Sequence, residues 1–165
     1  MQPIIRQIHK FLIKNKKTVA VAESCTGGLL SSMLTSISGS SIYFILGVVA
    51  YSNRAKSHLL SVPATLIIRR GAVSEEVAQR LSRNVRKLAK ADFGIGITGI
   101  AGPTGATFEK PVGTVFVSID SPHRNICKRF KFNGSRKNIQ KSAVLKALAL
   151  LKDELNGPIL SARRP

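Results

Sequence analysis

The sequence predicts an α/β domain with three layers, in which helices cover both faces of a mainly parallel sheet that also contains one antiparallel hairpin. Through the first two thirds of the chain, short apolar runs alternate with amphipathic stretches of helical periodicity, a pattern typical of parallel α/β sheets. Later, two strand-like runs are separated by a short turn, which indicates the hairpin. With 165 residues and no internal repeat or linker, we expect one domain, residues 1–165, with a frayed tail at 158–165.

Apolar periodicity and turn residues define the elements of the first half. Apolar residues at helical spacing predict an amphipathic N-terminal helix, and two short apolar runs predict buried strands. Gly27 and Gly28 open the helix after the first strand, and Ser52 is placed to cap the helix after the second. The expected order is a helix at 3–15, a strand at 18–22, a helix that ends before 38, a strand at 45–51 and a helix that contains 56–60.

The second half begins after Pro63 with a basic turn. Ser74, followed by Glu75 and Glu76, is typical of a helix start. A long segment rich in glycine and proline then separates a strand from the hairpin. The expected order is a helix from 74 to about 90, a strand at 93–98, a loop at 99–113, strands at 112–119 and 125–132, and a helix at 135–155.

The composition excludes several classes of protein. No apolar run reaches transmembrane length, and the first residues lack the layout of a signal peptide. The two cysteines, Cys25 and Cys127, are too few for a disulfide framework. We therefore expect a cytoplasmic protein with free thiols and no association with membranes.

The charge is unusual, because 26 Lys and Arg residues face only eight acids and give a net charge of +18. Nucleic-acid binding is one interpretation of such a balance. However, the basic residues are scattered along the chain, and aromatic residues for base stacking are few. A basic surface that attracts anions, including an anionic small substrate, is the favoured interpretation.

Polar side chains follow three of the predicted strands, in segments 23–28, 51–53 and 98–103. In open α/β sheets, ligands bind beyond the carboxyl ends of the strands. If the three strands are parallel neighbours, these segments meet at one edge of the sheet. The sequence therefore predicts a site at that edge.

A nucleophilic serine is the first candidate in this site. Ser24 needs a base in contact to react at neutral pH, and the three histidines, at positions 9, 58 and 123, are poorly placed for that role. Lysine is another base, provided that burial and the lack of nearby acids lower its pKa. Lys56 lies in a stretch without acids, and Tyr51 could relay a proton between Lys56 and Ser24.

Each candidate has a structural alternative. Ser24 could cap a helix, Lys56 could be a surface residue, and Tyr51 could be a half-buried residue at a strand end. Cys25 is a second candidate nucleophile, although thiols in such places are usually packing residues. Glu23 could bind either amides of the turn or hydroxyl groups of a ligand.

Two further segments could bind anions. Backbone amides of the loop at 99–113 could form an oxyanion hole, or the segment could be a plain loop. Gly134, Ser135 and Arg136 could seat a phosphate at a helix start, or Ser135 could be only a cap. No group of Cys, His, Asp and Glu has metal-ligand spacing, so we expect neither a metal nor another cofactor.

Several of these motifs together resemble the CinA carboxy-terminal domain family, whose members act as nicotinamide-nucleotide amidases. The resemblance runs from about residue 18 to 132 and is carried by AESCTGGLL, GSSIYFILGVVAYSNRAKSHLLSV, GAVSEEVA and GITGIAGPTGATFEKPVGTVFV. It implies Ser24 as the nucleophile, with Tyr51, Lys56 and Thr98 as its catalytic partners. The substrate-binding residues that we expect are Glu23, Thr26, Gly27, Gly99, Gly102 and Arg136.

The resemblance implies deamidation of nicotinamide mononucleotide to nicotinate mononucleotide and ammonia. The alternative is a non-catalytic basic domain that binds nucleotide or nucleic acid, and for a small α/β domain of this kind we expect a homo-oligomer. Two departures from the family pattern stand out. Gly105-Ala106 replaces a Gly-Gly pair in the loop, and Gly134-Ser135-Arg136 replaces Gly-Asp-Arg at the start of the last helix. Neither departure touches Ser24, Tyr51 or Lys56. The resemblance is to the stand-alone form of the family, without the larger amino-terminal domain of some relatives.

Overall fold

The computed structural model describes residues 2–157, so the tail expected at 158–165 lies outside the described residues. The helices are α1 (Gln2–Lys14), α2 (Leu29–Leu34), α3 (Asn53–Leu60), α4 (Ala64–Arg70), α5 (Glu75–Ala89) and α6 (Arg136–Leu155), with a short 3₁₀ helix, η1 (Ser40–Ile42). The strands are β1 (Val19–Glu23), β2 (Phe44–Val49), β3 (Phe93–Gly99), β4 (Thr114–Asp120) and β5 (Asn125–Lys131).

The five strands form one sheet in the order β2-β1-β3-β4-β5. β1 lies between β2 and β3 and is parallel to both, so the carboxyl ends of these three strands meet at one edge as expected. The antiparallel β4–β5 hairpin is confirmed. β4 is also antiparallel to β3, so the sheet is more evenly mixed than the predicted mainly parallel one. The loop between β3 and β4 contains no crossover helix, so the chain turns back and β4 runs antiparallel beside β3.

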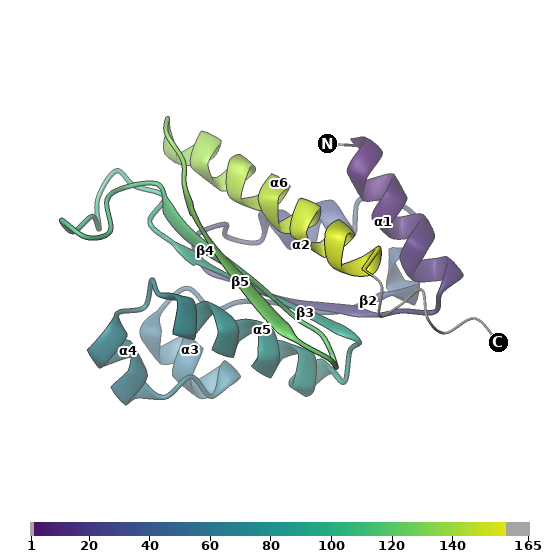
Figure 1. Ribbon diagram of the computed structural model, residues 1–165, viewed down its shortest axis with the longest axis horizontal. Coiled ribbons are helices and arrows are strands. Elements are labelled where there is room, and N and C mark those ends of the chain that lie inside the picture. Colours follow the sequence, from purple (N-terminus) through teal and green to yellow (C-terminus); the bar gives the residue numbers. More distant parts are fainter. Residues whose placement is uncertain (1, 158–165) are drawn as a thin grey trace.

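Helices cover both faces of this sheet, which confirms the three-layer α/β prediction. α1, α2 and α6 lie on one face, and α3, α4 and α5 lie on the other (Figure 1). Because side chains alternate along a strand, β1 contributes to both cores. Val19 and Val21 pack with α1, α2 and α6, whereas Ala20 and Ala22 pack with the helices on the opposite face.

The contact between α5 and β3 is unusually close. A Cβ atom on Gly94 would lie 2.0 Å from the carbonyl oxygen of Ser82, and one on Gly96 would lie 2.4 Å from that of Ala78. Both distances are far shorter than van der Waals contact, so only glycine fits at these two positions. The glycines of the β3 sequence therefore set how deeply α5 sits on the sheet.

The main local difference from the predicted elements is a helix where a turn was expected. The segment expected as a basic turn after Pro63 is the helix α4. Its Ile67 is buried in the apolar core between the sheet and the helices α3, α4 and α5. Ser52 caps α3, as predicted, by accepting a hydrogen bond from the amide of Ala55 at 3.0 Å. Ser74 precedes α5, but its hydroxyl donates to the carbonyl of Gly71 instead of accepting from the helix.

Candidate active site

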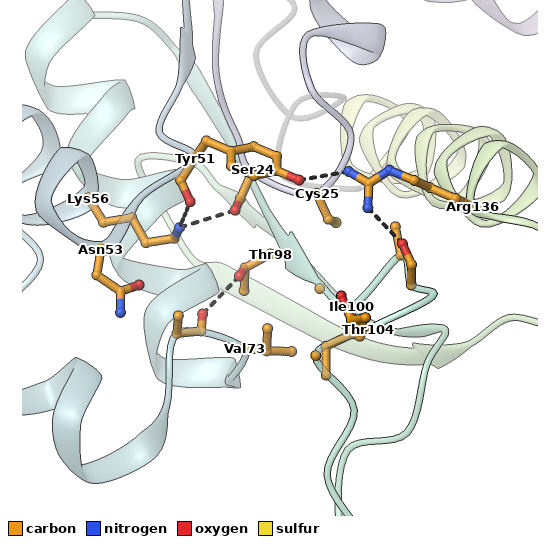
Figure 2. A pocket seen from close by; sticks show the side chains of 15 residues that line it. Ser24, Cys25, Tyr51, Asn53, Lys56, Val73, Thr98, Ile100, Thr104 and Arg136 are labelled. Atoms are coloured by element: carbon orange, nitrogen blue, oxygen red, sulfur yellow. Dashed lines mark hydrogen bonds between the residues drawn. The ribbon is translucent and has the colours of Figure 1, made fainter.

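A cavity of about 300 Å³ opens at the edge where β2, β1 and β3 end (Figure 2). Its walls come from segments far apart in the sequence, because the loops that follow three neighbouring parallel strands meet at this edge. The lining residues include Ser24, Cys25, Tyr51, Asn53, Lys56, Val73, Thr98, Gly99, Gly102, Thr104 and Arg136.

The central contact in this cavity joins Lys56 to Ser24. Lys56 lies on α3 with only 2% of its surface exposed. Its Nζ donates to Ser24 Oγ at 3.1 Å and to the backbone carbonyls of Ala50 at 2.9 Å and Tyr51 at 3.1 Å. The end of β2 therefore holds the lysine head group, and the end of β1 presents the serine to it.

Burial lowers the pKa of Lys56 below its ordinary value. Among the ion pairs of the described residues, none involves Lys56, so no carboxylate stabilises its charged form. A neutral amine has two N–H bonds and one lone pair. With the N–H bonds directed to the carbonyls of Ala50 and Tyr51, the lone pair is left for the hydroxyl proton of Ser24. This is the arrangement of a general base beside a nucleophile.

Tyr51 contacts Lys56 through its backbone, not through its hydroxyl group. The tyrosine side chain is 57% exposed, and its hydroxyl accepts a hydrogen bond from Arg136 at 2.7 Å. This differs from the expected relay between Lys56 and Ser24, because those two side chains are already in direct contact. The hydroxyl of Tyr51 therefore belongs to the Arg136 side of the cavity (Figure 2).

Arg136 closes that side of the cavity. It is the first residue of α6, and its guanidinium also donates to the carbonyl of Gly102 at 2.8 Å. Ser135 acts as the N-cap of α6, with its hydroxyl accepting from the amide of Asn138 at 3.4 Å. One arginine thus ties together the end of β2, the loop after β3 and the start of α6.

Glu23 has a structural role in place of the expected substrate contact. It is fully buried, and it is not among the residues that line the cavity. Its carboxylate accepts hydrogen bonds from the amides of Gly28, Leu30 and Ser31 and from the hydroxyl of Ser31, at 2.7–3.1 Å. These are the amides that the first turn of a helix leaves without partners. Glu23, and not Ser24, therefore satisfies the start of α2.

Thr26 and Gly27 also lie outside the cavity wall, although we expected both to bind substrate. Thr26 is buried, and its Oγ1 has no hydrogen-bond partner among the described residues. Gly27 is exposed with φ of +62°, a left-handed conformation that favours glycine. Gly27 therefore serves the turn between Ser24 and α2.

Thr98, Gly99 and Gly102 do line the cavity, as expected. Thr98 is buried, and its hydroxyl donates to the carbonyl of Ala72 at 2.8 Å. A Cβ atom on Gly99 would lie 3.0 Å from Cys25 Sγ, so glycine allows the close contact between Cys25 and the end of β3. The remaining lone pairs of the Thr98 hydroxyl are free to accept a donor from a ligand.

Cys25 lines the cavity but is poorly suited to be the nucleophile. Burial raises the pKa of its thiol to about 12, and the negative charge of Glu23 acts in the same direction. The reactive form of cysteine is the thiolate, and at neutral pH this thiol stays protonated. The geometry therefore favours Ser24 over Cys25.

Several lining residues were not among the predicted site residues: Asn53, Ala72, Val73, Ile100, Ala101, Thr104 and Gly105. Asn53 follows the end of β2, and a polar residue at that position was a detectable signal. Val73 comes from the loop between α4 and α5, which no feature of the sequence connected with the site. Within residues 2–157, no three His, Cys, Asp or Glu side chains gather as metal ligands would. In the same part of the chain, no helix combines the length and apolar character needed to cross a membrane.

Comparison with known proteins gives consistent matches. The family model described as the CinA C-terminal domain matches residues 1–155. The chain is 48% identical over 148 residues to a CinA-like protein of Thermotoga maritima, which covers 90% of this chain and 36% of the relative. It is 50% identical over 134 residues to a CinA-like protein of an Anaeromyxobacter species, which covers 81% of this chain and 33% of the relative. The chain thus spans about a third of the length of these curated relatives.

Solved structures match over almost their whole length. The competence/damage inducible protein CihA from Agrobacterium tumefaciens gives a TM-score of 0.90 at 34% identity, covering 94% of both chains. The competence damage-inducible protein A from Klebsiella pneumoniae gives 0.89 at 33% identity, covering 93% of this chain and 95% of that one. These proteins share both the fold and the length of the described chain.

Proposed function

The chain belongs to the CinA C-terminal domain family, and from this premise we propose that it is a nicotinamide-nucleotide amidase. The proposed reaction is hydrolysis of the carboxamide of nicotinamide mononucleotide to nicotinate mononucleotide and ammonia. The observation that carries the proposal is the buried contact between Lys56 Nζ and Ser24 Oγ at 3.1 Å. A lysine has little reason to be buried without a carboxylate unless its neutral form is useful.

In the first half of the reaction, Ser24 Oγ forms a bond with the amide carbon while its proton passes to Lys56 Nζ. Collapse of the tetrahedral intermediate breaks the C–N bond, and the leaving nitrogen takes that proton from Lys56 to depart as ammonia. We assign stabilisation of the oxyanion to backbone amides of the loop after β3, because residues of this loop from Gly99 to Gly105 line the cavity.

In the second half, water attacks the acyl-serine ester. Lys56 takes a proton from the water and returns it to Ser24 Oγ as nicotinate mononucleotide leaves. The same lysine thus acts as base and acid in turn, which requires a pKa nearer to neutrality than that of an exposed lysine.

Arg136 is the residue that we assign to the phosphate. A guanidinium has five N–H donors in a planar fork suited to phosphate oxygens, and the Arg136 guanidinium forms two hydrogen bonds with the described residues. The positive charge of the whole chain would add a long-range attraction for the anionic nucleotide.

The first test is ammonia release from nicotinamide mononucleotide by the wild type, Ser24→Ala and Lys56→Met, with folding matched by circular dichroism. We expect both variants to lose at least about 10²-fold in kcat, because nucleophile and base act in the same step. Cys25→Ala is the control, and it should retain activity. Full activity of Lys56→Met would eliminate the proposed base, and a well-folded wild type without ammonia release would eliminate the amidase.

Nucleic-acid binding by a non-catalytic domain is the second candidate, favoured by the excess of basic side chains. Its test is binding of duplex DNA at increasing salt, where a contact with several phosphates gives a steep loss of affinity. Weak binding with a shallow salt dependence would leave the amidase as the better account of this chain.

A further inference from the structure

The turn that carries Ser24 forms few hydrogen bonds with distant parts of the chain. Residues 24–28 lie between β1 and α2, and most of their hydrogen bonds are to near neighbours in the sequence. Only two hydrogen bonds join this turn to more distant parts of the described chain. One is the contact of Lys56 Nζ with Ser24 Oγ, and the other runs from Gln140 Nε2 to the carbonyl oxygen of Cys25 at 2.8 Å. The first holds the serine side chain, so the second is the one that holds the backbone of the turn.

Gln140 supplies a donor that the backbone of this turn does not provide. The carbonyl groups of Ser24 and Thr26 accept from backbone amides in the turn and at the start of α2, at 3.1 and 3.2 Å. The carbonyl group of Cys25 accepts from no backbone amide among the described residues, and its partner there is the side chain of Gln140. A peptide group is planar, so this hydrogen bond fixes the orientation of the whole group that follows Cys25.

Gln140 lies on the same face of α6 as Arg136, one turn further along the helix. Arg136 contacts Tyr51 and Gly102 on one side of the cavity. Gln140 reaches the turn after β1, where a Cβ atom on Gly27 would lie 4.0 Å from its Nε2. The first two turns of α6 therefore contact both the wall of the cavity and the turn that carries the nucleophile.

We propose that Gln140 is a positioning residue for Ser24. The inference rests on the proposed role of Ser24 as the nucleophile. The backbone of the turn determines where Ser24 Oγ lies relative to Lys56 Nζ, 3.1 Å away, and a rotation of the peptide group after Cys25 is passed back along the chain to Ser24. Without the hydrogen bond from Gln140, the serine spends less time in contact with its base. Small displacements of a reacting group cause large losses in rate.

Turnover and substrate binding should respond differently to substitution of Gln140, because this residue is not among those that line the cavity. Gln140→Leu removes the donor, and Gln140→Glu removes it while keeping the shape of the side chain. Each should lower kcat for nicotinamide mononucleotide about tenfold, the effect of one lost hydrogen bond, with KM within about twofold. Gln140→Arg keeps N–H donors in reach of the Cys25 carbonyl group and should restore kcat to within about threefold of the wild type.

The control is Gln79→Leu, with folding of every variant checked by urea unfolding. Gln79 is also a half-buried helical glutamine that donates one hydrogen bond, but its partner is Glu75 on the same helix, α5. That variant should keep the wild-type kcat. In Gln140→Leu one neutral side chain replaces another, so the apparent pKa of kcat/KM should stay at its wild-type value while the plateau falls. A rise in KM at unchanged kcat, or no recovery in Gln140→Arg, would overturn the positioning role.

A second assay does not depend on the proposed substrate. With p-nitrophenyl acetate, Ser24 Oγ forms a bond with the acetyl carbon, its proton passes to Lys56, and p-nitrophenolate leaves. The rate of p-nitrophenolate release above that of Ser24→Ala should fall about tenfold in Gln140→Leu and recover in Gln140→Arg. Equal rates in the wild type and Gln140→Leu would overturn this inference and leave the proposed function standing. A wild type no faster than Ser24→Ala would overturn the nucleophile and the inference together.

Discussion

At the scale of single residues, the proposed chemistry depends on the few groups that contact the amine of Lys56. Three atoms accept from its Nζ, and two of them are backbone carbonyls that a side-chain substitution cannot remove. No carboxylate of residues 2–157 forms an ion pair with Lys56. In the proposed mechanism, the protonation state of this one buried amine therefore controls the nucleophile, and pH becomes a direct probe of the site.

Activity should rise with pH. In the proposed mechanism the neutral form of Lys56 is the reactive one, and burial lowers its pKa, so kcat/KM should increase through a pKa below that of a free lysine. The measurement is ammonia release between about pH 6 and about pH 10, corrected for stability. A profile that is flat, or that falls over this range, would contradict Lys56 as the base.

The same shift predicts a stability effect of known sign. Because the folded pKa lies below the unfolded one, the unfolded chain binds more protons between the two values, and the free energy of unfolding rises with pH there. Below the folded pKa, the buried charge destabilises the native state. Urea unfolding should therefore show Lys56→Met gaining stability relative to the wild type at low pH and losing that advantage as pH rises.

The phenol of Tyr51 should influence binding more than turnover. Tyr51→Phe keeps the backbone carbonyl that holds Lys56 but removes the hydroxyl that accepts from Arg136. We expect KM to rise by roughly threefold to tenfold, the loss of about one hydrogen bond, with kcat within about twofold. A large fall in kcat with unchanged KM would instead support the proton relay that the sequence suggested.

Sequence reasoning predicted that Ser24 and Lys56 lie together, which the structure confirms, but it could not orient all of the nearby side chains. Ser24 and Lys56 were identifiable because a strand end and an acid-free stretch are visible in the sequence. For Glu23 both the turn amides and the substrate were considered, and strand alternation places it on the same face as Val19 and Val21, toward α2. The direction of the Tyr51 side chain could not be predicted, because it depends on Arg136, which is 85 residues away.

At the scale of elements, α2 depends on one buried carboxylate. It is a short helix, and its N-terminal amides are satisfied by Glu23 from the preceding strand. The turn that carries Ser24 lies between the strand and this helix. The position of the nucleophile is therefore linked to the stability of α2. The sequence predicted the helix and offered the amides of this turn as one of two roles for Glu23, and the structure shows that role.

Replacing Glu23 by glutamine should destabilise the fold. The amide group of glutamine places donors against the donors of α2, which leaves buried polar groups without partners. We expect a loss of roughly 2–3 kcal/mol in the free energy of unfolding, measured by urea titration. Asp153→Asn is the control, because this exposed carboxylate on α6 has no ion pair among the described residues. A rise in KM at unchanged stability would favour the substrate contact.

At the scale of the whole molecule, charge is distributed unevenly. Five ion pairs among the described residues involve only four acids, Glu76, Asp92, Asp120 and Glu154. Most basic side chains of the described residues therefore have no carboxylate partner, and their field extends into solvent. The fold class was predictable from the alternation of elements, whereas the order of the strands, which brings the ends of β2, β1 and β3 together, required the structure.

This field should make substrate capture sensitive to salt. For nicotinamide mononucleotide, KM should rise several-fold between about 0.05 M and about 0.5 M NaCl with kcat nearly unchanged, because salt screens long-range attraction between exposed charges. A neutral carboxamide without the phosphate is the control substrate and should show no such rise. Equal salt effects on both substrates would show that the field does not guide the nucleotide.

The contact between Ser24 and Lys56 has a consequence for when the chain becomes reactive. The two residues are 32 positions apart and meet only because β1 and β2 pair and α3 folds back over the end of β2. In an unfolded chain the lysine is protonated at neutral pH and the serine is inert. In the proposed mechanism, folding itself therefore makes Ser24 reactive, and the unfolded chain lacks this reactivity. Covalent labelling by a serine-directed acylating reagent would then count native molecules in a mixed population.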